Sequence, residues 1–147
     1  MIKESALLKI IEFGSLSELK KALKVYPIDT QDAEGMTLLA WASIKGDEEK
    51  VSLLLKMGAN PNISCNEGMS PLMYAAANNH AKIIQKLLEK GADLEQTDRT
   101  GWGDAEIWAS LHNADEAREV LRTHRKKIAS QSPNNRQFIE RGRGNGE

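Results

Sequence analysis

Apolar residues recur along this chain at helical spacing, in short segments separated by polar stretches. Val51, Leu54 and Leu55 lie at positions i, i+3 and i+4, and the same spacing recurs within residues 84–88. Side chains at this spacing share one face of a helix. The pattern therefore predicts a short amphipathic helix over each of these segments.

Glycines mark the same repetition. Gly35, Gly68 and Gly101 are spaced 33 residues apart. The sequence around them recurs as DAEGMTLLAWAS, CNEGMSPLMYAA and DRTGWGDAEIWAS, and the later segment VSLLLKMGANPN is echoed by IIQKLLEKGADLE. A fixed period in this range indicates a stack of repeated structural units.

Residues beside the glycines predict how each unit is built. We expect Gly35 and Gly68 to adopt φ > 0 in a turn, which other residues reach only at a cost. Thr37 and Ser70 are expected N-caps, whose hydroxyls accept a helix-start N–H. Pro71 suits the first helical position, because its missing N–H has no helical partner there. Each unit is thus expected to begin with a turn that leads into a capped helix.

Capping signals also mark helices outside the central repeats. The sequence predicts a first helix over residues 5–13. Ser15 with Glu18 forms the pattern of a capping box, and Asn113 with Glu116 repeats that pattern before the last helix. We expect these flanking units to be degenerate end repeats, because terminal units must close a stack against water.

The repeats resemble the ankyrin repeat family, whose pattern is D-x-x-G-x-T-P-L-x-x-A-A followed by a second helix ending L-L-x-x-G-A-D-x-N. The matching positions are Gly35, Thr37, Leu39, Ala42, Leu54, Leu55, Gly58, Ala59 and Asn62, then Gly68, Ser70, Pro71, Leu72, Ala75, Ala76, Leu87, Leu88, Gly91, Ala92 and Asp93. The match is strong over residues 32–95 and covers about four repeats in all. It implies an all-α ankyrin-repeat solenoid of stacked helix–turn–helix units joined by β-turn-like loops.

The resemblance sets the expected organisation of the chain. The expected units are an N-terminal capping repeat (1–31), two ankyrin repeats (32–64 and 65–97), a C-terminal capping repeat (98–127) and a basic tail without fixed structure (128–147). The last repeat departs from the pattern, because Trp108 aligns with Trp41 only after a shift of one residue.

Composition fits one soluble domain. The chain has 147 residues, 28% of them charged, and no apolar run approaches the about 20 residues that span a bilayer, so we expect no membrane segment. Its one cysteine, Cys65, excludes an intramolecular disulfide and suits a reducing compartment, so we expect a cytoplasmic protein. Cys65 holds the turn position that Asp32 and Asp98 hold elsewhere, and we interpret it as a substituted turn residue rather than a nucleophile.

Charge is divided unevenly along the chain. Residues 122–147 contain seven Lys/Arg and two Asp/Glu, a net charge of +5, whereas residues 1–121 contain 13 and 19, a net charge of −6. The acidic body favours a partner that is basic at the contact. The basic end has the charge to touch nucleic acid or an acidic partner. We favour its interpretation as a solvated terminus and do not expect nucleic acid as the partner.

Residue types needed for catalysis or metal binding are not grouped in the sequence. His80, His112 and His124 are isolated, and none is paired with cysteine or carboxylate at zinc-like spacing. The glycines do not form a phosphate-binding loop. We therefore expect no enzymatic activity, no cofactor and no metal site.

The resemblance places the candidate site on the turn tips and the outward sides of the first helices, a concave surface in this family. The residue after each turn glycine is Met36, Met69 or Trp102, so we expect three large apolar side chains in a row. The flanking candidates are Glu34, Glu67 and Arg99 on the tips, and Ile44, Lys45, Asn78, Leu111 and His112 at the helix ends. Two interpretations stay open: the row binds a partner, or its side chains fold over the neighbouring turn and are partly buried.

The resemblance implies a non-catalytic protein-binding module, whose preformed concave face docks one partner protein. Inhibition or neutralisation of that partner is part of this expectation, because some small bacterial ankyrin proteins resemble inhibitors or immunity proteins. The alternatives are a general adaptor and a nucleic-acid-associated regulator that works through the basic tail.

Overall fold

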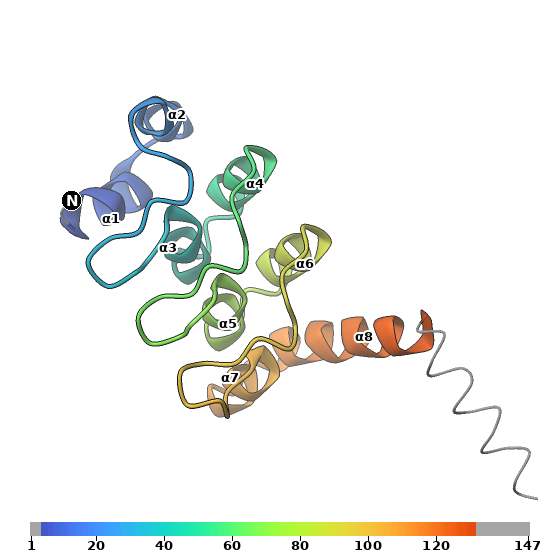
Figure 1. The fold of residues 1–147 in the computed structure, drawn as a ribbon. Helices are drawn as coiled ribbons and strands as arrows, with labels where there is room; N and C mark the ends of the chain where they lie inside the picture. The colour runs from blue at the N-terminus through green and yellow to red at the C-terminus, as the bar shows by residue number, and fades with distance from the viewer. Residues whose placement is uncertain (1–3, 132–147) are drawn as a thin grey trace, which may run out of the picture.

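Helices account for all regular structure in the described part of the chain. The computed structural model describes residues 4–131, and these residues form eight α-helices and no strand. The helices are α1 (Glu4–Phe13), α2 (Leu16–Val25), α3 (Leu38–Lys45), α4 (Glu48–Lys56), α5 (Pro71–Ala77), α6 (Ala81–Glu89), α7 (Ala105–Leu111) and α8 (Asp115–Gln131). The odd-numbered helices pack in one layer and the even-numbered helices in a second (Figure 1). The predicted all-α repeat fold is confirmed.

The predicted N-caps are present. Oγ1 of Thr37 accepts the N–H of Ala40 at 3.1 Å, which caps α3. Oγ of Ser70 accepts the N–H of Met73 at 3.3 Å, and Pro71 occupies the first position of α5. Because each cap is made within three residues of the helix start, the local sequence is sufficient to specify it.

Two turn glycines adopt the expected backbone. Gly35 has a φ of 81° and Gly68 has a φ of 78°, both in the left-handed region. A Cβ at Gly35 would also lie only 2.7 Å from Oδ1 of Asn66 in the next turn. Glycine is therefore needed at Gly35 both for its backbone angle and for the close approach of the next turn.

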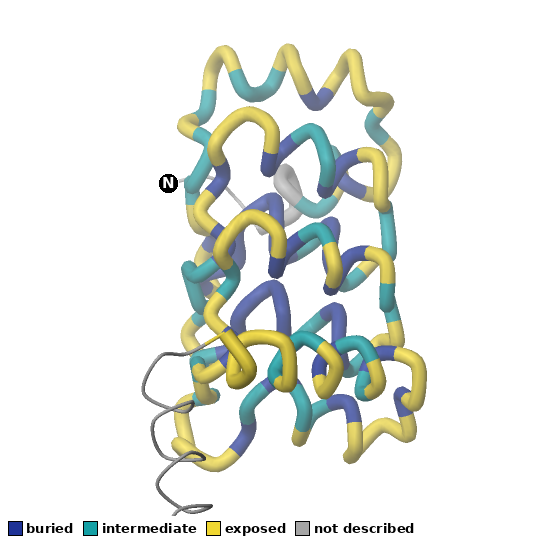
Figure 2. The backbone as a smooth tube through the Cα atoms, turned by 90° about the vertical axis from the view of Figure 1, so that its right-hand side faces the viewer, coloured by how far each residue is buried: buried dark blue, intermediate teal, exposed yellow. Residues whose placement is uncertain are grey.

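A continuous apolar core lies between the two layers, where Figure 2 shows buried segments inside the stack and exposed segments outside. Ala42, Ala75 and Ala109 are fully buried, and their small size lets the odd-numbered helices approach closely. The largest fully buried side chains are Ile11, Leu19, Leu38, Leu39, Leu54, Leu72, Met73, Ile83, Ile84, Leu87 and Leu121. Burial of each such side chain stabilises the fold by about 1.5–3 kcal/mol.

The first repeat contains a capping box and is joined to the next repeat by a buried lysine. Oγ of Ser15 accepts the N–H of Glu18 at 3.2 Å, and Oε2 of Glu18 accepts the N–H of Ser15 at 2.9 Å, as the sequence predicts. Farther along, the buried Nζ of Lys50 donates to the carbonyl of Ile11, 39 residues earlier. This bond joins α4 to the end of α1, so it stabilises the contact between the first two repeats.

The predicted capping box at Asn113 and Glu116 is wrong. Asn113 adopts a left-handed backbone with a φ of 54°, and α8 begins only at Asp115. Asparagine tolerates this conformation better than most residues, which suits the tight link between α7 and α8. The first turn of α8 receives an acceptor from the neighbouring repeat instead, because Oδ1 of Asn79 accepts the N–H of Ala117 at 3.0 Å.

The last helix is longer than expected. α8 has 17 residues and ends at Gln131, so it continues past the predicted boundary between residues 127 and 128. In Figure 1 it runs across the picture, whereas α4 and α6 are seen nearly end-on. The prediction of a tail without fixed structure lies outside the described residues from residue 132 onward. None of the helices within residues 4–131 is long and apolar enough to cross a bilayer.

Candidate functional site

The candidate site is built on three turns that project from the layer of odd-numbered helices (Figure 1). We call the surface formed by residues 32–37, 65–70 and 98–104, with the outward sides of α3, α5 and α7, the turn face. Backbone hydrogen bonds join the turns in series. The N–H of Asn66 donates to the carbonyl of Glu34 at 2.9 Å, and the N–H of Arg99 donates to the carbonyl of Glu67 at 3.0 Å. The tips therefore form one continuous, fixed surface.

The predicted row of three exposed apolar residues is wrong for its two methionines. Met36 is 3% exposed and Met69 is 8% exposed, whereas Trp102 is 82% exposed. Met36 lies between its own turn and the following one, with Cys65 and Tyr74 nearby, so the next repeat covers it. The favourable burial of a flexible thioether side chain explains this placement. In the described part of the chain no turn follows Trp102 to cover it in the same way.

The third turn contains one extra residue, and that residue is Trp102. In the first turn the N–H of Asp32 donates to the carbonyl of Met36, whereas in the third the N–H of Asp98 donates to the carbonyl of Gly103. Gly103 is therefore the structural equivalent of Met36, and it is buried in the same way. Trp102 is an insertion whose side chain projects into solvent.

The three other tip candidates and the helix-end candidate Asn78 are exposed, as a contact role requires. Glu34, Glu67 and Arg99 lie at the tips of three successive turns. Asn78 ends α5, and its Nδ2 donates to the carbonyl of Tyr74 at 2.8 Å. The side chain of Asn78 is therefore partly engaged in ending its own helix. Contact of these four residues with a partner stays a prediction.

The helix-end candidates differ in their surroundings. Ile44 is half-buried, and its carbonyl lies 3.2 Å from Nε2 of His80. Nζ of Lys45 pairs with Glu12 at 2.5 Å, so this cation is already engaged. Leu111 is 67% exposed on the outward side of α7.

His112, the last helix-end candidate, is exposed, and its ring stacks on Trp108 with centroids 5.8 Å apart. This contact limits the rotation of the ring. The exposed aromatic and apolar candidates therefore lie in the last repeat, and they are Trp102, Leu111 and His112.

Besides the N-cap bonds, the side chain at the first position of each turn forms a hydrogen bond with an aromatic side chain of the helix that follows. The bonds share a geometry and are Asp32 Oδ2 to Trp41 Nε1 (2.9 Å), Cys65 Sγ to Tyr74 Oη (3.2 Å) and Asp98 Oδ2 to Trp108 Nε1 (3.1 Å). The central repeat is the exception, because a thiol and a phenol replace the carboxylate and the indole. Cys65 thus keeps the structural role of the turn residue, in agreement with its interpretation as a substituted turn position.

The central pair lies in a negative environment. Burial raises the pKa of the Tyr74 phenol above its ordinary value of 10.0, the hydrogen bond with Cys65 raises it further, and the carboxylates of Glu34 and Glu67 add to the effect. Tyr74 is therefore neutral at physiological pH. A neutral phenol does not serve as a base for the Cys65 thiol, so the pair has no feature of an activated nucleophile.

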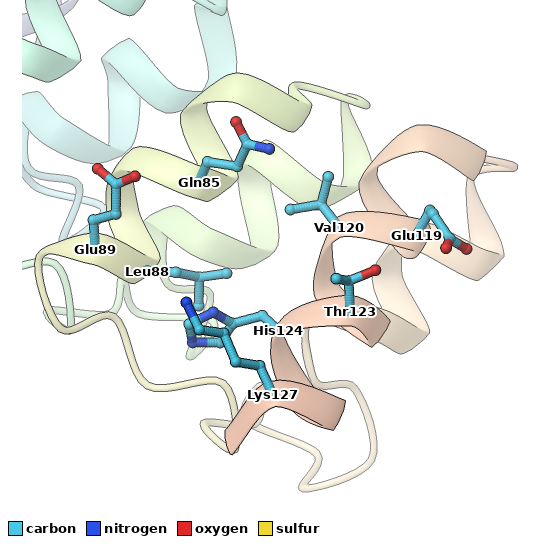
Figure 3. Close-up of a pocket in the computed structure, with 8 residues that line it drawn as sticks. All are labelled: Gln85, Leu88, Glu89, Glu119, Val120, Thr123, His124 and Lys127. Atoms are coloured by element: carbon cyan, nitrogen blue, oxygen red, sulfur yellow. The ribbon is translucent and has the colours of Figure 1, made fainter. Parts of the chain in front are cut away.

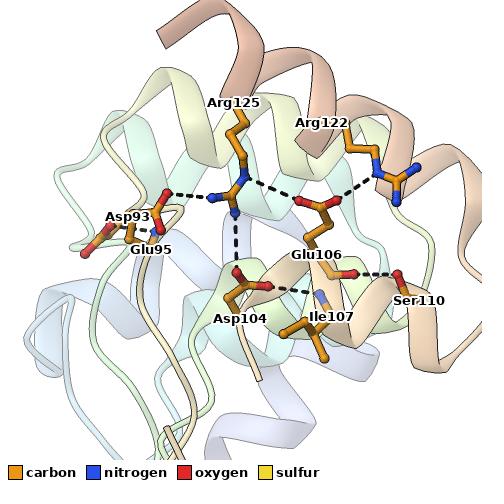
Figure 4. Close-up of polar contacts among 8 residues, drawn as sticks. All are labelled: Asp93, Glu95, Asp104, Glu106, Ile107, Ser110, Arg122 and Arg125. Carbon is orange, nitrogen blue, oxygen red and sulfur yellow. Dashed lines mark hydrogen bonds and ion pairs between the residues drawn. The ribbon is translucent and has the colours of Figure 1, made fainter. Parts of the chain in front are cut away.

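A carboxylate cluster around Arg125 was not predicted (Figure 4). Its guanidinium pairs with Glu95 at 2.8 Å and with both Asp104 and Glu106 at 3.3 Å, and Glu106 also pairs with Arg122 at 2.8 Å. Asp104 and Glu106 are only two residues apart, a spacing that would not place both side chains on one face of a helix. Asp104 lies outside the helix as the N-cap of α7, and the cations come from α8. Two cations of the basic end are thereby engaged with carboxylates.

A hollow lies in the layer of even-numbered helices, away from the turns. It has a volume of about 350 Å³ between α6 and α8, and its lining includes Leu88, Val120, His124 and Lys127 (Figure 3). Its polar residues include both carboxylates and a lysine, so they do not favour one chemical class of ligand. Among residues 4–131, no group of histidine, cysteine and carboxylate side chains is arranged to hold a metal ion.

Comparison with known proteins agrees with the geometry of the repeats. A family model described as ankyrin repeats (three copies) matches residues 7–98. Palmitoyltransferase AKR1 of Saccharomyces cerevisiae is 35% identical over 97 residues, which are 66% of this chain and 13% of that protein. Inactive serine/threonine-protein kinase TEX14 of Bos taurus is 32% identical over 108 residues, 72% of this chain and 7% of that protein.

A shorter relative matches a larger share of its own length. The 26S proteasome non-ATPase regulatory subunit 10 of Dictyostelium discoideum is 34% identical over 94 residues, 62% of this chain and 40% of that protein. The chain therefore spans less than half of the length of each of these relatives. Because the family model matches more than half of the chain and the structure has the corresponding turns and helix pairs, the chain belongs to the ankyrin repeat family.

Proposed function

We propose that this chain is a non-catalytic module that docks a protein partner on the turn face and masks part of that partner. Ankyrin repeats generally mediate protein–protein interaction, and a turn face built from them is the natural place for it. The observation that carries the proposal is the exposure of Trp102. This residue is inserted in the third turn, and its side chain is 82% exposed. Exposed tryptophan gains much free energy when a partner covers it, and it is enriched among the residues that dominate binding.

The rigidity of the turn face supports a binding role. The turns are hydrogen-bonded in series through Asn66 and Arg99, and each is tied to its helix by a side-chain bond. A preformed surface loses little conformational entropy when it binds, so more of the contact energy appears as affinity.

The charge of the chain indicates the chemistry of the partner. Residues 1–121 carry a net charge of −6, and the first two tips present Glu34 and Glu67. A surface that is basic at the contact would be attracted to these tips and would associate faster. The partner proposed here is therefore a protein with a basic contact surface, met in the cytoplasm because the single cysteine suits a reducing compartment.

Masking extends to inhibition when the covered surface includes the partner's active site. The name of one relative describes a non-ATPase regulatory subunit, which is in keeping with regulation through binding rather than catalysis. Inhibition or neutralisation is the finer form of the proposal, and a general adaptor is its alternative. A nucleic-acid role is less favoured, because Arg122 and Arg125 are already paired with carboxylates.

Affinity capture tests the proposal. The full chain and its Trp102→Ala and Leu111→Ala variants would be used to capture protein from the lysate of the source cell. Val25→Ala and Met57→Ala are matched controls, because these apolar residues are also exposed but lie at the ends of α2 and α4. We expect one protein to be held by the wild type and the controls and lost by Trp102→Ala. Equal capture by all variants would contradict binding on the turn face.

Activity of the captured partner separates the finer alternatives. Addition of one equivalent of this chain should abolish the activity of an inhibited partner, whereas an adaptor leaves activity unchanged. Capture of nucleic acid that falls steeply with added salt would instead favour the role of the basic end.

A further inference from the structure

A hollow on the turn face lies between the first two turns and has a volume of about 260 Å³. Its lining residues come from both turns and from α5, and they are Glu34, Met36, Cys65, Asn66, Glu67 and Tyr74. We call it the inter-turn cavity. The buried thioether of Met36 and the half-buried ring of Tyr74 give it apolar and aromatic walls.

The inter-turn cavity is preformed. The N–H of Asn66 donates to the carbonyl of Glu34 at 2.9 Å, and Nδ2 of Asn66 donates to the carbonyl of Ala33 at 3.0 Å. The ring of Tyr74 is held by the 3.2 Å hydrogen bond between its Oη and Sγ of Cys65. Both walls and the rim are thus held by the fold before any partner arrives.

The charged residues that line the inter-turn cavity within the described part of the chain are acidic. They are Glu34 from the first turn and Glu67 from the second, and no cationic side chain of residues 4–131 lines it. Both carboxylates act electrostatically on the phenol of Tyr74, which places their charge near the aromatic wall. A ligand that fits must therefore be cationic and able to lie against an aromatic ring.

The exceptional pair of the central repeat, Cys65 and Tyr74, lines the cavity. In the first turn both carboxylate oxygens of Asp32 are occupied, one by backbone N–H groups and the other by the indole of Trp41. At the equivalent place in the second turn, Cys65 has a thiol instead of a carboxylate, and Tyr74 carries a smaller ring than tryptophan. Cysteine in place of aspartate removes a fixed negative charge from the turn. Tyrosine in place of tryptophan reduces the volume of the side chain that forms the aromatic wall.

We propose that the inter-turn cavity receives an arginine side chain of the partner protein. This proposal rests on the proposed function and names the contact that recognises the partner. A guanidinium is planar, carries five donors and pairs with carboxylates such as Glu34 and Glu67. Its flat face also stacks on a tyrosine ring, as the wall formed by Tyr74 requires. Lysine offers a compact charge without a planar face, and a neutral side chain gains nothing from the carboxylates.

A titration with short peptides tests this assignment on the full chain. The probes are acetyl-Gly-Arg-Gly-amide, its citrulline analogue, which is neutral and nearly isosteric, and its lysine analogue. Amide signals of residues 34, 36, 66 and 74 would be followed by NMR at constant ionic strength. We expect saturable shifts with the arginine peptide, smaller shifts with lysine and none with citrulline.

Variants locate the binding. Glu67→Gln should weaken the arginine peptide about threefold, the size expected for the loss of one exposed ion pair. Glu89→Gln, an exposed glutamate on α6, should have no effect. Unchanged dispersion of the NMR spectrum shows that both variants are folded. Equal shifts with citrulline or lysine, no shift at these amides, or equal binding by Glu67→Gln would each overturn the assignment.

The result of the peptide titration can be distinguished from the result of the capture experiment that tests the proposed function. If the arginine peptide does not bind but Trp102→Ala still loses the captured protein, the cavity assignment is wrong and partner binding on the turn face stands. If the peptide binds as expected but no protein depends on Trp102, the cavity assignment stands and the wider function fails.

Discussion

The indole Nε1 of Trp41 donates a hydrogen bond of 2.9 Å to Oδ2 of Asp32, nine residues earlier. The other oxygen of the same buried carboxylate accepts the N–H groups of Glu34 and Met36, at 3.0 and 2.9 Å. One side chain therefore orders its own turn and ties that turn to α3. This makes the turn and the helix a single rigid unit.

Replacement of Asp32 by alanine should destabilise the protein by about 2–4 kcal/mol, because three donors lose their acceptor in a buried setting. Urea unfolding followed by circular dichroism would measure the change. Trp41→Phe removes only one of the three bonds and keeps an aromatic ring, so it should cost about 1 kcal/mol. Equal losses for the two variants would show that the ring, rather than the carboxylate, orders the turn.

The bond between Asn79 and the start of α8 gives a second prediction. Asn79→Gly retains the left-handed backbone, whose φ is 57°, but removes the oxygen that accepts the N–H of Ala117. The variant should lose about 1 kcal/mol of stability, the usual value of an N-terminal cap. Hydrogen exchange should become faster in the first turn of α8 and stay unchanged in α4. Unchanged protection of Ala117 would mean that this contact does not stabilise the helix.

Through its ion pairs, Arg125 should stabilise the C-terminal half of α8. Arg125→Gln removes the pairs with Glu95, Asp104 and Glu106 and should lower stability by about 1 kcal/mol, because partly exposed pairs gain strength only as a network. The matched control is Arg118→Gln, which loses a single exposed pair with Asp115. The difference between the two variants should shrink in high salt, since salt screens exposed charges. An equal effect of both substitutions would argue against a network.

The raised pKa of Tyr74 predicts that the free energy of unfolding depends on pH in the alkaline range. Its pKa in the folded protein is raised above 10.0, the ordinary value that the unfolded chain retains. The folded protein therefore holds this proton more tightly, so the contribution to stability is complete below pH 10 and decreases as the pH rises above it. Tyr74→Phe has no such proton to lose, and its free energy of unfolding should fall less steeply above pH 10. Parallel pH profiles for wild type and variant would refute the shift.

Much of the fold was predictable because its signals are local. The 33-residue spacing of Gly35 and Gly68 reports a turn that needs φ > 0, and Thr37 and Ser70 cap helices within three residues of themselves. Such interactions depend on chain geometry over a few residues, so they can be read without knowing what packs against them. The same reasoning failed at Asn113, because a left-handed link and a helix cap favour the same residue type.

The candidate site depended on contacts between repeats, which the linear sequence does not contain. Met36 and Met69 follow the turn glycines, but whether such a side chain is exposed depends on the turn that packs above it. The one-residue shift of Trp108 did indicate an insertion between Gly101 and α7. Only the hydrogen bond from Asp98 to the carbonyl of Gly103 identified Trp102 as the inserted residue.

The sequence by itself determined the repeat period and the starts of α2, α3 and α5, because these follow from local backbone geometry and hydrophobic spacing. Its repeat pattern also carried the resemblance to the family. The tertiary structure decided which side chains of those repeats reach solvent. It buried Met36 under the next turn, exposed Trp102, brought Asn79 to the start of α8 and placed Arg125 between Asp104 and Glu106. Each of these outcomes joins residues at least 19 positions apart or depends on a neighbouring repeat, so packing rather than propensity sets them.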